Sequence, residues 1–334
     1  MRFLIDHKKK MIFLIACFTL LYFLRQYVYD DRGHSTQMVM GGQFYQQFED
    51  LEINDMKTDQ TDMPEYFRPS KLPILNDREF NTDFFWKYHE KEPSEINLPK
   101  SLLKTPEDTI INYFSILEHA ENLTKDKMGG CGTVGNAKLP FPVAYAFLTP
   151  DYQKRVTYQD YLKSFEGIGH TSLIKLRKTP DDQSNPNNIR YFMEIETIEG
   201  SSKNVTYFAY YYGFIDIMEE RNGYRIANME FYGEDFLCAP YHGWAHNAEA
   251  SVDIRYGDWC ALVAKRYPTE QNGYVKNIYF KGTDGNDYLI EFYQLTNGTD
   301  IEMAQYKKDT NGSWKLVKLD PYKCLEEKKD ETSL

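Results

Sequence analysis

The chain has 334 residues, of which 42% are hydrophobic and 16% aromatic, a composition typical of one or two globular domains rather than a disordered chain. Its formal net charge is -11, from 50 acidic side chains against 39 Lys and Arg. Such an acidic surface repels phosphate backbones, so we expect no nucleic-acid partner.

The N-terminus has the features of a membrane anchor. Residues 1–10 include three consecutive lysines, and an uncharged apolar run follows from Met11 to Leu24. The run is short for a spanning helix and matches a signal-peptide core in length, but no small-residue cleavage pattern follows it. Tyrosines after the run suit a membrane interface. We therefore expect a cytoplasmic tail at 1–10, an uncleaved signal anchor in the membrane at 11–28, and the C-terminal bulk outside the cell.

The cysteines leave two questions open. The sequence "LIAC", which ends at Cys17, also fits a bacterial lipoprotein box, although most apolar residues follow this cysteine instead of preceding it. The choice between signal anchor and lipoprotein stays open. Four more cysteines in the exported part allow three disulfide connectivities: Cys131, Cys238, Cys260 and Cys324. We prefer the pair Cys238 and Cys260, which flank a predicted helix; free buried thiols are the alternative.

Residues 29–104 are predicted to form an acidic stalk. Prolines are scattered through this segment and no period is sustained, which favours a mostly extended tether. An aromatic group interrupts it at Phe84, Phe85, Trp86 and Tyr88. These rings are expected either to form a short helix that docks on the folded body or to be an exposed motif for a partner.

Residues 105–237 are predicted to form helices followed by a sheet. A helix is expected to begin at Thr105 as N-cap, with Pro106 at the first helical position. Further helices are expected over 141–153 and after Thr157. Beyond Gly169 the sequence alternates in four strand-like segments separated by turn formers, which predicts an antiparallel meander and an α+β fold.

Residues 238–325 are predicted to form one long helix and a second four-stranded meander, followed by a tail at 326–334. The helix would lie in "YHGWAHNAEASVDIRYGDWC", residues 241–260. Asp-Gly and Asn-Gly turns then connect the strands of the meander.

Three segments carry a resemblance to a known superfamily: "TYQDYLKSFEGIGHTSLIKLRK", "YFMEIETIEG" and "YFAYYYGFIDIMEERNGYRIANMEF". Over about 105–235 their order resembles the nuclear transport factor 2-like superfamily. The resemblance implies helices packed on a strongly curved antiparallel sheet around a conical pocket. Members include isomerases, dehydratases, small-ligand binders and non-catalytic scaffolds. One subgroup with a similar topology consists of membrane-anchored scaffold proteins of bacterial secretion and conjugation systems.

An enzyme of this superfamily would need an acid or base inside the cone. The candidates are Asp160, His170, Glu194 and Glu196. Glu194 and Glu196 share one strand face, which is equally compatible with a solvated outer surface. The sequence has no nucleophile-plus-base pattern, phosphate loop or paired-cysteine metal motif. Catalysis is therefore the less favoured alternative.

A histidine pair is the candidate metal site. His242 and His246 stand four residues apart, and Glu249 or Asp253 would add an oxygen ligand for zinc. The same residues fit the polar border of an ordinary amphipathic helix, or a pH-sensing His246 beside two carboxylates. No other cofactor is expected.

These observations favour a non-catalytic binding or scaffold module of the bacterial cell envelope, whose partner is an envelope protein or a small ligand. The alternatives are an isomerase- or dehydratase-type enzyme that uses the cone pocket, or a metal- or pH-sensing domain through His242 and His246.

Overall fold

The computed structural model describes residues 37–45, 74–128, 136–180, 188–234 and 243–332. The expected tail and anchor over 1–28 lie outside these residues, as do Cys17, Cys131 and Cys238. Within the described ranges no helix combines the length and apolar character needed to cross a bilayer. Residues from Met38 onward form one compact unit.

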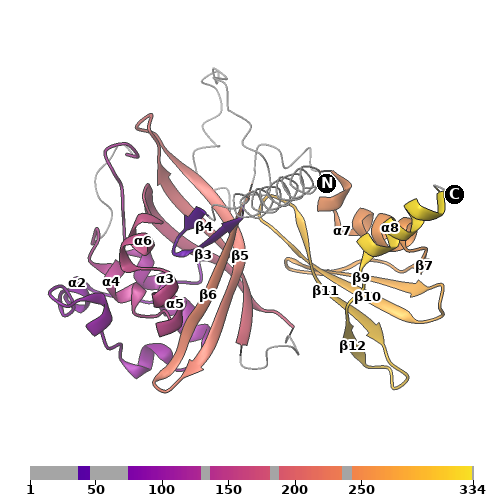
Figure 1. Cartoon of the computed structure of the whole chain (residues 1–334), viewed down its shortest axis with the longest axis horizontal. Coiled ribbons are helices and arrows are strands. Elements are labelled where there is room, and N and C mark those ends of the chain that lie inside the picture. Colours follow the sequence, from indigo (N-terminus) through magenta and orange to yellow (C-terminus); the bar gives the residue numbers. More distant parts are fainter. Residues whose placement is uncertain (1–36, 46–73, 129–135, 181–187, 235–242, 333–334) are drawn as a thin grey trace, which may run out of the picture. The chain divides into compact units, whose positions relative to one another are not determined.

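Six strands form the first sheet in the order β1-β2-β6-β5-β4-β3 (Figure 1). Their bounds are β1 Gln37–Val39, β2 Gly42–Tyr45, β3 Ile168–Lys178, β4 Asn188–Gly200, β5 Thr206–Glu220 and β6 Gly223–Gly233. Strands β3 to β6 form the predicted antiparallel meander. Strand β2 pairs in parallel with β6. The α+β class is confirmed.

Short helices cover one face of this sheet (Figure 1). They are α2 Thr82–Trp86, η2 Pro93–Glu95, η3 Lys100–Leu103, α3 Pro106–Glu118, α4 Pro140–Tyr145, α5 Pro150–Arg155 and α6 Tyr158–Lys163. The predicted caps are confirmed, since the hydroxyls of Thr105 and Thr157 each accept a backbone N–H three residues on. The single helix expected over 141–153 is two helices, because Thr149 caps a new one at Pro150 and a proline disfavours helical backbone before it.

The expected stalk differs from the structure wherever 29–104 is described. Strands β1 and β2 belong to the first sheet, and Met40, Phe85 and Leu103 are buried in its core. Helix α2 docks on the body, which confirms the first option for the aromatic group. These apolar side chains enter the core singly and at irregular spacing, so they produce no periodic signal in the sequence.

The second sheet has the order β12-β11-β10-β9-β7, with β8 paired to β9. The bounds are β7 Val263–Arg266, β8 Glu270–Asn272, β9 Val275–Gly282, β10 Asp287–Gln294, β11 Asp300–Lys308 and β12 Trp314–Val317. Strands β9 to β12 confirm the predicted second meander, to which β7 and β8 are additions.

The long helix expected over 241–260 is not continuous. A short turn, η5 (Trp244–His246), precedes Asn247, whose extended backbone caps α7 (Ala248–Ser251). The chain then continues as a π-helix, η6 (Val252–Trp259). A π-helix closes its hydrogen bonds over five residues, so the expected 100° turn per residue does not hold there. Ala248, Val252 and Tyr256 are the buried positions that pack against the second sheet.

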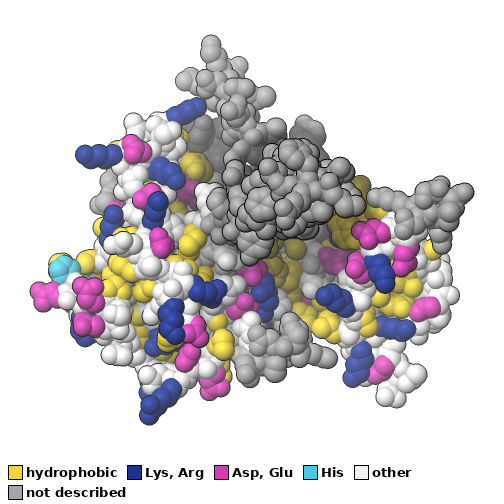
Figure 2. Space-filling view, viewed as in Figure 1, with side chains coloured by type: hydrophobic (Ala, Val, Ile, Leu, Met, Phe, Trp, Pro, Cys, Tyr) yellow, Lys and Arg dark blue, Asp and Glu magenta, His cyan; other side chains and the backbone are white. Residues whose placement is uncertain are grey.

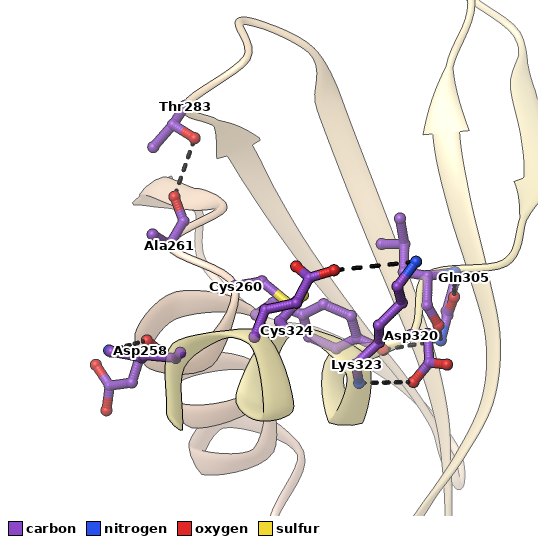
Figure 3. The surroundings of a disulfide bond; sticks show 12 residues. Asp258, Cys260, Ala261, Thr283, Gln305, Asp320, Lys323 and Cys324 are labelled. Carbon is purple, nitrogen blue, oxygen red and sulfur yellow. Dashed lines mark hydrogen bonds and ion pairs between the residues drawn. A yellow bond between two sulfur atoms is a disulfide. The ribbon is translucent and has the colours of Figure 1, made fainter. Parts of the chain in front are cut away.

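The predicted disulfide between Cys238 and Cys260 is wrong, because Cys260 is bonded to Cys324 (Figure 3). The two Cα atoms are 5.0 Å apart, within the range that a disulfide spans. Cys324 belongs to helix α8 (Pro321–Thr332), which crosses the boundary expected between the second module and a tail at 326–334. The sequence offered no signal that this charged helix returns to η6.

Candidate functional site

The space between the first sheet and its helices is where the resemblance places a conical pocket. Tyr191, Met193 and Ile195 of β4 point into it. The space is filled by fully buried aromatic side chains: Tyr113, Phe114, Phe141, Phe147, Tyr152, Tyr161 and Phe165. The interior is therefore a packed core around these rings.

The buried tyrosine hydroxyls in this core have partners. The hydroxyl oxygens of Tyr113 and Tyr161 are 3.0 Å apart and share a hydrogen bond. Tyr152 donates to the carbonyl of Gly41 at 2.8 Å. Burial raises the pKa of both Tyr113 and Tyr152 above the ordinary value, so these phenols stay protonated. The core thus holds satisfied polar groups and no ionised acid–base pair among them.

Glu194 and Glu196 lie on the opposite face of the first sheet. Side chains alternate along a strand, and Phe192 on their face packs against the second sheet. Glu196 is buried and accepts a hydrogen bond of 2.5 Å from the Tyr210 hydroxyl on the neighbouring strand. The sequence was compatible with these carboxylates on either the cone-facing or the outer face of the sheet. The structure places them on the face away from the cone.

Asp160 and His170 have separate structural roles. Asp160 completes the N-terminal cap of α6, where it accepts a hydrogen bond of 2.6 Å from the Thr157 hydroxyl. His170 belongs to β3 and lies near the backbone of Glu118, the last residue of α3, and burial lowers its pKa. Within the described residues, no hydrogen bond joins Asp160, His170 and Glu194 to one another.

Of the predicted metal ligands, the structure describes His246, Glu249 and Asp253. His246 ends η5 and Glu249 lies in α7, with the extended Asn247 between them, so helical spacing does not align the pair. The described ranges contain no group of three His, Cys, Asp or Glu side chains that could hold a metal ion. His242 lies outside those ranges, and zinc binding through it stays a prediction.

A buried ion pair that sequence reasoning did not single out as a pair lies where the two sheets meet. The Lys175 ammonium is 2.5 Å from a Glu194 carboxylate oxygen, and the two side chains are 3% and 0% exposed. Lys175 also donates to the Gln294 carbonyl at 2.9 Å. The other Glu194 oxygen accepts the backbone N–H of Thr296 at 2.8 Å. The ion pair of the first sheet thus binds the turn after β10.

Further contacts continue this junction between the sheets. The Arg177 guanidinium donates to the Tyr293 hydroxyl at 2.9 Å, and Tyr274 donates to the Leu176 carbonyl at 3.4 Å. Around them is an apolar cluster of Phe192, Tyr212, Val275, Tyr293 and Leu295. We call these contacts, with Lys175 and Glu194, the sheet junction. In the sequence, the two ends of the ion pair are charged residues within apolar strand segments: Lys175 in "SLIKL" and Glu194 in "FMEIE".

Glu234 adds a second carboxyl group to the junction. Its oxygens are buried beside Glu194, Lys175 and the backbone of Asn297. Burial, and then repulsion from Glu194, hold the pKa of Glu234 well above its ordinary range, while Lys175 counters them. The cluster is electrically balanced when Glu234 keeps its proton. Because Lys175 and Glu194 are closed to solvent, the arrangement offers no access to a substrate.

We expect the protonated Glu234 to make stability depend on pH. Its folded-state pKa lies above the ordinary 4.5 of an unfolded chain, so its contribution is complete below that pH and is lost as pH rises through the folded-state pKa. The free energy of unfolding of the wild type should therefore fall more steeply above about pH 4.5 than that of Glu234→Gln. Urea titrations across pH measure this difference.

The matched control for this experiment is Glu219→Gln, which replaces a carboxyl group with an amide at an exposed position on β5. Its pH dependence should follow the wild type. Parallel curves for the wild type and Glu234→Gln would show that Glu234 is not protonated in the folded protein at neutral pH.

Comparisons with known proteins give no family assignment. No protein-family model matches the chain, and no curated protein matches its sequence. A solved structure described as "Ntf2 like protein involved in plasmid conjugation" aligns with 10% identity over 52% of this chain and 87% of that chain, with a TM-score of 0.16.

Proposed function

We propose that the chain is a single-pass membrane protein whose C-terminal bulk lies outside a bacterial cell, as a non-catalytic binding or scaffold unit of the envelope. Its first module would be a nuclear transport factor 2-like domain and its second a helix-and-sheet module. Residues 11–28 would be the anchor, and an envelope protein the partner.

The observation that carries this proposal is the filled cone. An enzyme of the superfamily needs an acid or base in an open pocket, whereas aromatic rings occupy the interior here. The candidate carboxylates Glu194 and Glu196 face away from it, and each already has a partner.

Two further features support an exported scaffold. The Cys260–Cys324 disulfide is typical of proteins in an oxidising compartment. The sheet junction ties the second module to the first, which suits a rigid binding surface better than a mobile active site. On the face shown in Figure 2, basic side chains are scattered among acidic ones, which fits a protein partner better than nucleic acid.

Photo-crosslinking in intact cells tests the proposal. A photoreactive residue placed at Trp86 or at Tyr322, which are 54% and 58% exposed, samples one position on each module. We expect a discrete adduct with one envelope protein, which disappears when residues 1–28 are deleted. Recovery of the full chain in the soluble fraction, or adducts with cytoplasmic proteins alone, would contradict the proposal.

Replacing Tyr113 with phenylalanine tests the role assigned to the core. This change removes the hydrogen bond to Tyr161 and keeps the ring, so the free energy of unfolding should fall by about 1 kcal/mol. The crosslinked adduct should form as before. A stable Tyr113→Phe protein that loses its adduct would instead place the tyrosine pair in a functional site.

A further inference from the structure

A pocket of about 230 Å³ lies on the first module, apart from both the core and the sheet junction. The turn around η2, the connection between α4 and α5, and the β5–β6 hairpin form its walls. Its apolar lining includes Pro93, Ile96, Leu148 and Pro150. Its charged lining residues are Glu220, Arg221 and Arg225.

Arg225 is the lining residue that offers hydrogen-bond donors and a positive charge to a ligand in this pocket. Its guanidinium has five N–H donors, and the hydrogen bond that it makes within the described chain goes to the Ala146 carbonyl. No carboxylate of the described residues forms an ion pair with it within 4.0 Å. None of its nitrogens is a buried atom lacking a partner, so the remaining donors are open to the pocket. Arg225 is therefore a half-buried cation with unused donors.

The burial of this charge is unfavourable without an anion. Desolvation lowers the pKa of Arg225, and the more distant Glu220 compensates only in part. A second half-buried arginine of the first module has the carboxylate partners that Arg225 lacks. Arg190 is neutralised by Asp216 and Glu230 at 3.1 and 2.6 Å. A bound anion would neutralise the charge of Arg225, as Asp216 and Glu230 neutralise the charge of Arg190.

The charge and size of the pocket select the class of anion. Arg221 and Arg225 against Glu220 leave one net positive charge, in a chain whose overall charge is -11. A carboxylate matches this charge and the planar fork of a guanidinium, whereas the second charge of a phosphate would be repelled by Glu220. The volume lies below the roughly 300 Å³ at which drug-sized sites begin, and the accessible prolines Pro93 and Pro150 leave room for a short aliphatic group only.

We propose that this pocket binds a carboxylate that carries a short aliphatic group, with the carboxylate on Arg225 and the aliphatic part against Pro93 and Pro150. The site goes beyond the proposed scaffold role, because it assigns a ligand chemistry to a defined pocket. The carboxylate belongs either to a small free acid or to an acidic side chain of a partner segment.

Calorimetric titration of the purified full-length chain separates these sources. The probes are 4-methylpentanoate as a free acid, a blocked leucine–glutamate dipeptide as a partner segment, 4-methylpentanamide as the uncharged analogue, and inorganic phosphate. At least one carboxylate probe should bind at least about tenfold more tightly than the amide, as expected when a charge-assisted bidentate contact is lost. Equal binding of acid and amide, no binding of either carboxylate probe, or tighter binding of phosphate would overturn the proposal.

A conservative variant tests the residue. Arg225→Lys keeps the charge but loses the planar fork, so carboxylate affinity should fall by about tenfold. Arg155→Lys is the matched control, because this exposed arginine also donates to a carbonyl, that of Ala227, and does not line the pocket. Unchanged affinity in a folded Arg225→Lys protein would refute the assignment. If that variant does not fold, the comparison of acid with amide on the wild type still tests whether the pocket recognises a carboxylate.

Discussion

Replacing Lys175 with methionine should lower the free energy of unfolding by about 3–5 kcal/mol, the cost of leaving a buried charge without its partner. Lys175 is 3% exposed and neutralises Glu194, which is fully buried beside the carboxyl of Glu234. Without the ammonium, the junction must bury an unpaired carboxylate or take up a second proton. Urea denaturation at neutral pH measures the loss.

The double variant Lys175→Met with Glu194→Gln removes both charges. It should recover most of the stability, because paired removal avoids an uncompensated buried ion. The control is Lys154→Met, whose ion pair with Asp151 is exposed to solvent and is therefore expected to add little to stability. If Lys175→Met were no more damaging than Lys154→Met, the sheet junction would not be held by its buried charges.

Loss of the Cys260–Cys324 disulfide is expected to cost up to about 4 kcal/mol. The bond closes a loop with a sequence separation of 64 residues, and the loop-closure estimate for that length gives this value. Few other described contacts hold α8 against η6: Trp259 packs on Tyr322, and Lys328 donates to the Asp258 carbonyl. Cys260→Ser with Cys324→Ser should therefore release α8 from η6.

Hydrogen exchange resolves this effect along the chain. Protection should fall in α8 and η6, while the first sheet keeps the exchange rates of the wild type. Treatment of the wild type with a reductant should reproduce the pattern, and the double variant should not respond to the reductant. Undiminished protection of α8 in the double variant would show that noncovalent packing suffices to hold the helix.

Secondary structure was predictable where one local rule acted alone. Thr105 and Pro106 mark a helix start by hydrogen bonding and backbone geometry that need no distant partner. The strands of both meanders followed from alternation and from turn residues between them. The second module's helix was harder to predict, because a π-helix and a mid-segment cap at Asn247 break the single period that the sequence suggested.

Long-range pairings were not predictable from the sequence. Cys260 had several possible partners, and only the return of α8 to η6 brings Cys324 within reach. Glu194 was noted as a carboxylate, yet its pairing depends on which face of β4 meets the second sheet. Arg225 lies in a strand of alternating character, and its unused donors become evident only once the pocket walls are in place.

The sheet junction also has a consequence for the order of events during synthesis. The first sheet is complete when Gly233 has emerged, but Lys175 and Glu194 receive their backbone partners only with Gln294 and Thr296. Until then the ion pair is left uncovered on a finished sheet. The β10–β11 turn covers this ion pair when it arrives, so the sheet junction can form only late in synthesis.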